Sequence, residues 1–181
     1  MAQPRIELAT MNHHYMFYDL DDFFANAQKL GYPCVELWTS PQHFFMDYRQ
    51  NDPIERLSHL IDEYGIRIHG ICPEQCNPKP HNMAAKDASI QERTLAYFTR
   101  AVDVAKSVGA TQVLVTSGWA YYNEPVETAR ERSATCSNRS RAMQASRTST
   151  SPSKPCARPS RASPTPLPTS IFYYPWSMSP H

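Results

Sequence analysis

The first 133 residues alternate short apolar segments with longer amphipathic ones, and they do so four times in succession. The apolar segments expected to form strands are 6–10, 34–38, 67–72 and 112–118. Apolar side chains recur at helical spacing in 19–31, 51–65 and 89–109, and 124–133 looks like the start of a fourth helix. This alternation predicts an α/β fold with parallel strands joined by right-handed helical crossovers.

The ends of the expected helices carry recognisable signals. Asp19 and Asp52 are suited to N-caps, because a carboxylate can accept the unpaired amide protons of a first turn. Pro53 fits the first helical position. Gly31 and Gly65 suit the left-handed residue that follows a helix.

Two architectures accept this order of elements: an open doubly wound sheet and a (β/α)8 barrel. A glycine-rich phosphate loop after the first strand would favour the open sheet. The sequence there is MNHHYMFYD, which contains no glycine, so a dinucleotide site is not supported.

Polar and aromatic residues gather after the expected strands, where both architectures place their working surface. They include Asn12, His13, His14, Trp38, His81, Trp119 and Tyr121. Glu36 alternates with Val35 and Leu37, so its side chain points away from theirs and, in a barrel, toward the interior. We expect a polar pocket with aromatic walls at this rim. We expect Glu36 to have a functional role in this pocket rather than to be an exposed acid at the end of a strand.

Two other features have ordinary explanations. His43 lies among aromatic neighbours and is as compatible with a structural role as with a site. Cys72 and Cys76 form CPEQC, but no second Cys or Cys/His pair follows at zinc-finger spacing. We assign no metal site to this chain.

The composition changes abruptly after residue 133. Residues 1–133 hold all 17 acidic residues and 12 basic ones, whereas residues 134–181 hold six basic residues, no acid and no glycine. The five cysteines lack disulfide-framework spacing, and no apolar run approaches the ~20 residues of a membrane span. These features favour a reduced, cytoplasmic protein that does not enter a membrane.

The segments LGYPCVELW, SPQHFF and YGIRIHGICPEQCNPKPHNMA, followed by GATQVLVTSG, resemble the first half of a known fold. They are similar to the sugar isomerases and epimerases of the xylose-isomerase-like TIM-barrel superfamily, and among these to the fructoselysine 3-epimerases. The resemblance covers about residues 5–133. It implies the first half, about four βα units, of a (β/α)8 barrel.

The resemblance also implies a chemistry. Full-length members bind a divalent metal such as Mn²⁺, Mg²⁺ or Co²⁺, and two carboxylates move a proton beside a sugar carbonyl through an enediolate. The positions expected to bind substrate here are Glu36, Trp38, His43, Glu74 and Asn82. The metal-binding and acid–base carboxylates belong to strands five to eight, so we expect this chain to bind no metal and to be an inactive, truncated isomerase.

Residues 134–181 have three interpretations. They could be a disordered Ser/Pro/Arg-rich tail that binds RNA or another polyanion, or a flexible linker, or a segment translated after a shift of reading frame near residue 134. The basic residues are sparse and form no regular Arg-Ser repeat. When the reading frame shifts, the T that begins many serine codons becomes the second base of a codon, and codons with T as the second base encode apolar residues. We therefore favour a frameshifted, disordered tail.

The resulting hypothesis is a sugar or sugar-phosphate isomerase/epimerase-like protein whose partner is a small sugar. A polyanion-binding protein and a metal enzyme similar to apurinic endonucleases are the alternatives. The alternative similar to apurinic endonucleases requires histidines at the ends of strands three and four, but CPEQC and TSGWA stand there. Nucleic acid is therefore not expected as a partner. The edges of strands one and four would be exposed in a half-barrel, which predicts self-association.

Overall fold

A computed structural model describes residues 7–75, 81–148 and 170–174 of the 181-residue chain. Its strands are β1 (Ala9–Met11), β2 (Cys34–Thr39), β3 (Arg67–Pro73), β4 (Gln112–Thr116) and β5 (Ser170–Tyr174). Its helices are η1 (Asn12–Tyr15, a 3₁₀ turn), α1 (Leu20–Lys29), α2 (Ile54–Tyr64), α3 (Ala88–Val108) and α4 (Val126–Thr148).

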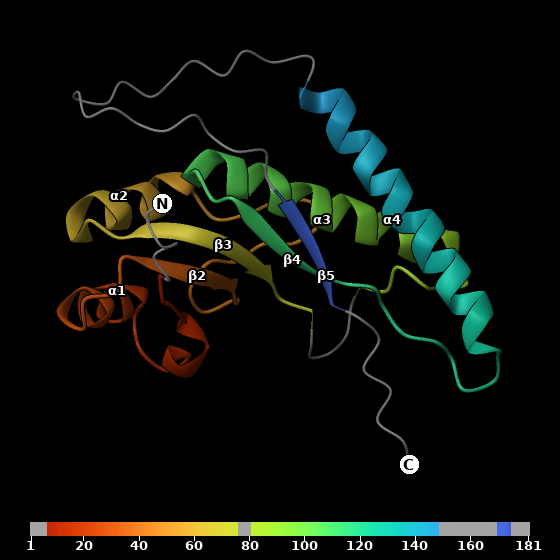
Figure 1. Cartoon of the computed structure of the whole chain (residues 1–181), viewed down its shortest axis with the longest axis horizontal. Coiled ribbons are helices and arrows are strands. Elements are labelled where there is room, and N and C mark those ends of the chain that lie inside the picture. Colours follow the sequence, from red (N-terminus) through yellow and green to blue (C-terminus); the bar gives the residue numbers. More distant parts are fainter. Residues whose placement is uncertain (1–6, 76–80, 149–169, 175–181) are drawn as a thin grey trace, which may run out of the picture.

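The strands form one parallel sheet in the order β1-β2-β3-β4-β5. Neighbours in the sheet are therefore neighbours in the sequence, and the order never reverses as it does in a doubly wound sheet. The helices follow the same order, because α1 contacts α2, α2 contacts α3, and α3 contacts α4 (Figure 1). This progression is that of a partial TIM barrel, so the predicted fold class is confirmed.

The two faces of the sheet differ in burial. Val35, Leu37, Val113 and Val115 are buried in the core with apolar side chains of α1, α2 and α3. Other residues of β2, β3 and β4 point to the opposite face and are only partly buried: Glu36, Trp38, Cys72, Gln112, Leu114 and Thr116. We call the face that carries these six residues the inner face, since it corresponds to the interior of a closed barrel.

The predicted C-terminal glycines are confirmed, whereas Asp19 is the N-cap of α1 without the predicted side-chain hydrogen bond to the first turn. Gly31 and Gly65 both follow helices with φ values of 78° and 65°, the left-handed conformation that glycine adopts without strain. The start of α2 differs from the prediction, because Pro53 is the N-cap and the helix begins at Ile54. Asp52 does not cap this helix; its carboxylate accepts a hydrogen bond from the Phe45 amide at 2.8 Å.

Helix α4 continues past residue 134, where disorder was predicted to begin. Residues 134–148 contain neither proline nor glycine, and the first proline after them is Pro152, so the segment has no helix-breaking residue. One face of α4 is buried against the domain through a series of small side chains: Ala129, Ser133, Cys136 and Ser140. The change in composition at residue 134 is therefore not a structural boundary.

Strand β5 also lies within the predicted tail. Its five residues pair in parallel with all of β4, from Gln112 opposite Ser170 to Thr116 opposite Tyr174. The edge of β4 is therefore covered, contrary to the expectation that it would be exposed. The rest of the tail, 149–169 and 175–181, lies outside the described residues.

Two further expectations concern the environment of the chain. None of the described helices is long and apolar enough to cross a membrane. The three cysteines that the structure describes, Cys34, Cys72 and Cys136, form no disulfide among the described residues.

Candidate functional site

Glu36 lies at the centre of the inner face, in a layer that crosses the sheet. It pairs with Met11 of β1 and with Gly70 of β3, and Gly70 pairs in turn with Gln112 of β4. A Cβ on Gly70 would come within 2.8 Å of Cγ of Gln112, so the glutamine side chain lies directly against this glycine. A side chain at position 70 would therefore force the Gln112 side chain to move.

The Glu36 side chain is partly buried, and burial raises its pKa above the ordinary value of a carboxyl group. Its carboxylate has neither a hydrogen-bond partner nor an ion-pair partner within the described part of the chain. A partly buried acid without a protein partner is costly unless a ligand or solvent satisfies it. The predicted direction of this side chain, away from Val35 and Leu37, is confirmed.

Trp38 and Glu74 form a second polar pair, one layer nearer the carboxyl ends of the strands. The indole Nε1–H donates to Oε2 of Glu74 at 2.6 Å, which links the end of β2 to the residue after β3. Glu74 is also held through its backbone, because its amide donates to Thr39 Oγ1 and its carbonyl accepts from the Tyr97 hydroxyl at 3.0 Å. The exposed His13 ring lies 5.1 Å from the Trp38 ring.

Asn12 holds the end of β2 in place. Its Oδ1 accepts from the Trp38 amide at 2.7 Å, and its Nδ2 donates to the Trp38 carbonyl at 2.9 Å. The carboxamide thus does what a peptide group of β1 would do, and it continues the β1–β2 pairing beyond Met11, where the backbone turns into η1. Asn12 is completely buried, so this pairing is shielded from water.

Gln75 does the same between β3 and β4. Its Nε2 donates to the carbonyls of Pro73 and Leu114, and its Oε1 accepts from the Thr116 amide at 2.6 Å. Asn12 was predicted only as one of several polar residues at the rim, and no role was predicted for Gln75. Each is a single amide within two residues of the end of a strand, so only the register of the next strand reveals these roles.

His43 was predicted to bind substrate, but its ring is only 1% exposed. Its Nδ1 lies 2.7 Å from Nδ2 of Asn12, and its Nε2 lies 2.9 Å from the Tyr18 carbonyl. The amide nitrogen can only donate and the carbonyl can only accept, which assigns the neutral tautomer with the proton on Nε2. This geometry favours a role for His43 in holding Asn12 rather than in touching a ligand.

Asn82, the last predicted substrate-binding residue, joins two rim loops instead of facing an open space. Its Oδ1 accepts from the amides of Ala84 and Trp119, and its Nδ2 donates to the Trp119 carbonyl at 3.1 Å. Gly118 makes this approach possible, since a Cβ there would lie 2.2 Å from Oδ1 of Asn82. Asn82 is 2% exposed, so its contacts are with the protein.

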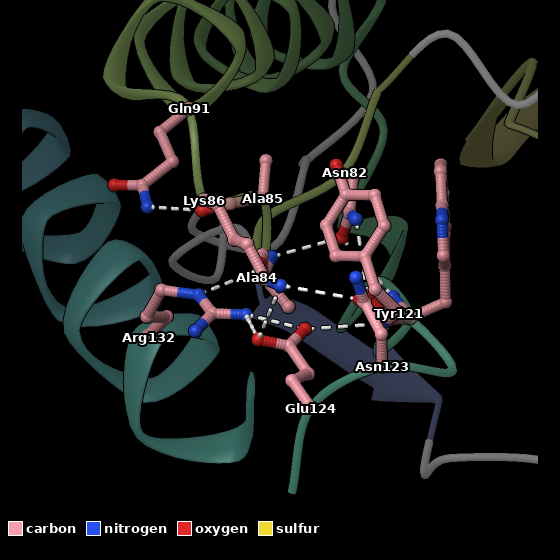
Figure 2. A network of polar contacts seen from close by, with 10 residues as sticks. Asn82, Ala84, Ala85, Lys86, Gln91, Tyr121, Asn123, Glu124 and Arg132 are labelled. Atoms are coloured by element: carbon pink, nitrogen blue, oxygen red, sulfur yellow. Dashed lines mark hydrogen bonds and ion pairs between the residues drawn. The ribbon is translucent and has the colours of Figure 1, made fainter. Parts of the chain in front are cut away.

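An ion pair also connects these loops to α4. Arg132 of α4 donates from Nη2 to both carboxylate oxygens of Glu124, at 2.7 and 2.6 Å, and from Nε to the Ala84 carbonyl (Figure 2). The pairing lowers the pKa of Glu124, mainly through the hydrogen bond from Arg132. Lys86 lies 3.7 Å from the same carboxylate and 5.1 Å from the Tyr121 ring centroid. The loops after β3 and β4 therefore form one connected wall.

His81 lies beneath this wall and contacts the Tyr97 ring face to face, at 3.9 Å between centroids. Its Nδ1 is buried and has no hydrogen-bond partner among the described residues. Burial lowers the pKa of His81 to about 4; Arg93 lowers the pKa further, and Asp47 opposes the shift. The imidazole is therefore neutral at physiological pH.

Comparison with known proteins identifies the fold family. The profile of the xylose isomerase-like TIM barrel family matches residues 24–145, more than half of the chain. The chain belongs to this family. The predicted resemblance is confirmed, and the match continues twelve residues past the change in composition at residue 133.

Two curated relatives are sugar epimerases. The fructoselysine 3-epimerases of Shigella flexneri and Escherichia coli O157:H7 are each 29% identical to this chain over 106 residues. The aligned region covers 59% of this chain and 38% of each relative. This member of the xylose isomerase-like family thus spans about two fifths of the length of the curated relatives it matches.

Solved structures show the same fold at lower identity. A D-tagatose 3-epimerase-like protein has a TM-score of 0.63 at 13% identity and covers 78% of this chain and 49% of its own. The 3-keto-D-glucoside 4-epimerase of E. coli has a TM-score of 0.61 at 15% identity and covers 81% and 54%. A putative xylose isomerase from Rhodospirillum rubrum has a TM-score of 0.61 at 14% identity and covers 78% and 50%.

The fold family implies a metal. No three His, Cys, Asp or Glu side chains converge within residues 7–75, 81–148 and 170–174. Cys72 is described, but Cys76, the other cysteine of CPEQC, is not. The described part of this xylose isomerase-like chain therefore offers no set of side chains that fits a metal ion.

Proposed function

We propose that this chain carries the sugar-recognition part of a ketose epimerase or isomerase. One observation carries the proposal: the carboxylate of Glu36, which has no protein partner among the described residues, lies on the inner face, two residues from Trp38 of the Trp38–Glu74 pair. The names of the relatives support the class of ligand, because they include fructoselysine 3-epimerases and a D-allulose 3-epimerase in complex with D-allulose.

The chemistry of the three side chains suits a ketose. The carboxylates of Glu36 and Glu74 can accept hydrogen bonds from sugar hydroxyls, and burial raises the pKa of Glu36, which makes its carboxylate a better acceptor. The Trp38 ring offers an apolar face to sugar C–H groups, and its bond to Glu74 fixes the ring orientation. In full-length members a divalent metal and two further carboxylates would supply the proton transfer beside the carbonyl.

Sugar binding by the full chain tests this proposal. D-fructose, D-tagatose and fructosyl-lysine are titrated into the protein and followed by calorimetry. We expect Glu36→Gln and Trp38→Phe to weaken binding about tenfold each, because each removes one direct contact. Glu92→Gln, on the exposed side of α3, is the matched control and should bind as the unmodified chain does. Absence of ketose binding, or equal binding by all variants, would contradict the proposal.

We also propose that the sequence after residue 133 has been translated out of its ancestral frame. The absence of acidic residues and glycine after that point supports this proposal, and the continuation of α4 is compatible with it. The coding nucleotide sequence is the test. A second frame that continues the barrel downstream of codon 133 is expected, and a downstream frame without strand–helix alternation would exclude the proposal.

A further inference from the structure

The Trp38–Glu74 pair is connected to a chain of hydrogen bonds that begins at the Tyr18 carbonyl, between η1 and α1. The chain runs from the Tyr18 carbonyl to Nε2 of His43, from Nδ1 of His43 to Nδ2 of Asn12, and from Asn12 to the backbone of Trp38. Each of these contacts is 2.7 to 2.9 Å long. The last bond in the series joins the Trp38 indole to Glu74.

The direction of every bond in this chain is fixed. The Trp38 amide can only donate and its carbonyl can only accept, so the orientation of the Asn12 carboxamide is unambiguous. This orientation turns Nδ2 toward His43, which must then accept on Nδ1 and carry its proton on Nε2. A change in either polar side chain therefore removes a bond that no rearrangement of the other can replace.

Asn12 and His43 are 0% and 1% exposed, so neither side chain can touch a ligand at the inner face. Whatever they contribute to sugar binding must pass through Trp38. We propose that Asn12 and His43 are positioning residues, which hold Trp38 in the orientation that lets its indole bond Glu74 and face the sugar. This inference rests on the proposed function for its biological meaning but has a test of its own.

The test is the indole N–H signal of Trp38 in ¹H–¹⁵N NMR spectra of the full chain. Trp38→Phe assigns the signal among the three tryptophans, and Glu74→Gln shows where it moves when the carboxylate partner is lost. Asn12→Ala should move the signal in the same direction as Glu74→Gln, although Asn12 does not contact the indole. Asn26→Ala, on α1, is the control and should leave it unchanged. An unchanged signal in Asn12→Ala would overturn the proposal.

A second variant keeps the test decisive if Asn12→Ala does not fold. Asn12→Asp still accepts from the Trp38 amide, but its second oxygen cannot donate to the Trp38 carbonyl or to Nδ1 of His43 as the native Nδ2 does. The indole signal should therefore move in the same direction as in Glu74→Gln. An unchanged indole signal in Asn12→Asp would contradict the proposed connection.

Sugar titrations separate this inference from the proposed function. If the unmodified chain binds ketose, Asn12→Ala should raise the Kd about fivefold while the Asn26→Ala control does not. Equal binding by Asn12→Ala and the unmodified chain would overturn the positioning role. If the unmodified chain binds no ketose, the proposed function fails, and the NMR result alone decides whether Asn12 and His43 position Trp38.

Discussion

Asn12 and Gln75 show how single amides can extend a parallel sheet beyond the ends of its strands. A carboxamide has the same donor and acceptor as a peptide group, so it can bond an adjacent strand after its own backbone has turned away. Each of these side chains is buried and bonds more than one backbone group of the next strand. A buried amide without these bonds would destabilise the fold by about 1–3 kcal/mol. The bonds therefore favour rim loops that begin where each carboxamide reaches the next strand.

At the same scale, Gly118 is expected to tolerate no side chain. Its φ of 93° disfavours other residues, and an added Cβ would lie 2.2 Å from Oδ1 of Asn82. We expect Gly118→Ala to lower the free energy of unfolding by about 2–3 kcal/mol, measured by urea denaturation. Gly31→Ala is the matched control: its φ is 78° and its Cβ would meet nothing within 4 Å, so it should cost only about 1 kcal/mol. Equal losses would show that the contact with Asn82 is unimportant.

His81 should make stability depend on pH. Burial lowers its pKa to about 4 in the folded chain, whereas an unfolded chain takes up this proton near the ordinary value of 6.5. The unfolded state therefore binds more protons between these values, and the free energy of unfolding falls as the pH drops below about 6.5. The loss attributable to His81 should reach about 2 kcal/mol at pH 5.

The variant His81→Phe retains a flat ring against Tyr97 but cannot be protonated. Its free energy of unfolding should fall less between pH 7.5 and 5 than that of the unmodified chain, by about 2 kcal/mol. His59→Gln, in an exposed position on α2, should keep the full pH dependence. The histidine would have no such role if His81→Phe and the unmodified chain lost stability in parallel.

At the scale of the elements, periodicity was sufficient to predict four strands and the helices between them, because each buries one apolar face. It could not predict the end of α4. The buried face of this helix consists of Ala129, Ser133, Cys136 and Ser140, which are too small and too polar to form an apolar stripe. Likewise, His43 and Asn82 were expected to face substrate, and only the three-dimensional contacts reveal that their polar atoms bond the protein.

Helix α4 provides a direct test of where ordered structure ends. Arg139 lies on the exposed side of α4, five residues past the predicted start of the disordered tail. Arg139→Pro should reduce the helical circular dichroism signal and lower the free energy of unfolding by about 3 kcal/mol, because proline removes a helix hydrogen bond. Arg139→Ala is the control and should change neither. Equal behaviour of the two variants would mean that residues around 139 are not helical.

For the whole molecule, the sequence predicted a half-barrel with two open edges, and the structure leaves β1 as one edge and β5 as the other. Leu8, directly before β1, is 67% exposed. We expect the chain to self-associate through the β1 edge as its concentration rises, since an unpaired strand is a template for another. The mass distribution in sedimentation experiments measures this association.

A charge at the edge should prevent that pairing. Leu8→Lys is expected to shift the sedimentation profile toward the monomer, because a lysine at an edge opposes strand addition. Leu30→Lys provides the matched control, since Leu30 is 71% exposed but follows α1, away from the sheet edge. If both variants associate as the unmodified chain does, the β1 edge is not the contact.

The unbroken strand order has a consequence for how the protein forms. Because every strand pairs only with the strands before and after it in the sequence, the first four βα units contact mainly their immediate predecessors. Each parallel pairing closes a loop that contains a whole helical crossover, and such pairings form slowly. Because the earlier strand of each pair is always synthesised first, a growing chain can complete these pairings in the order of the sequence.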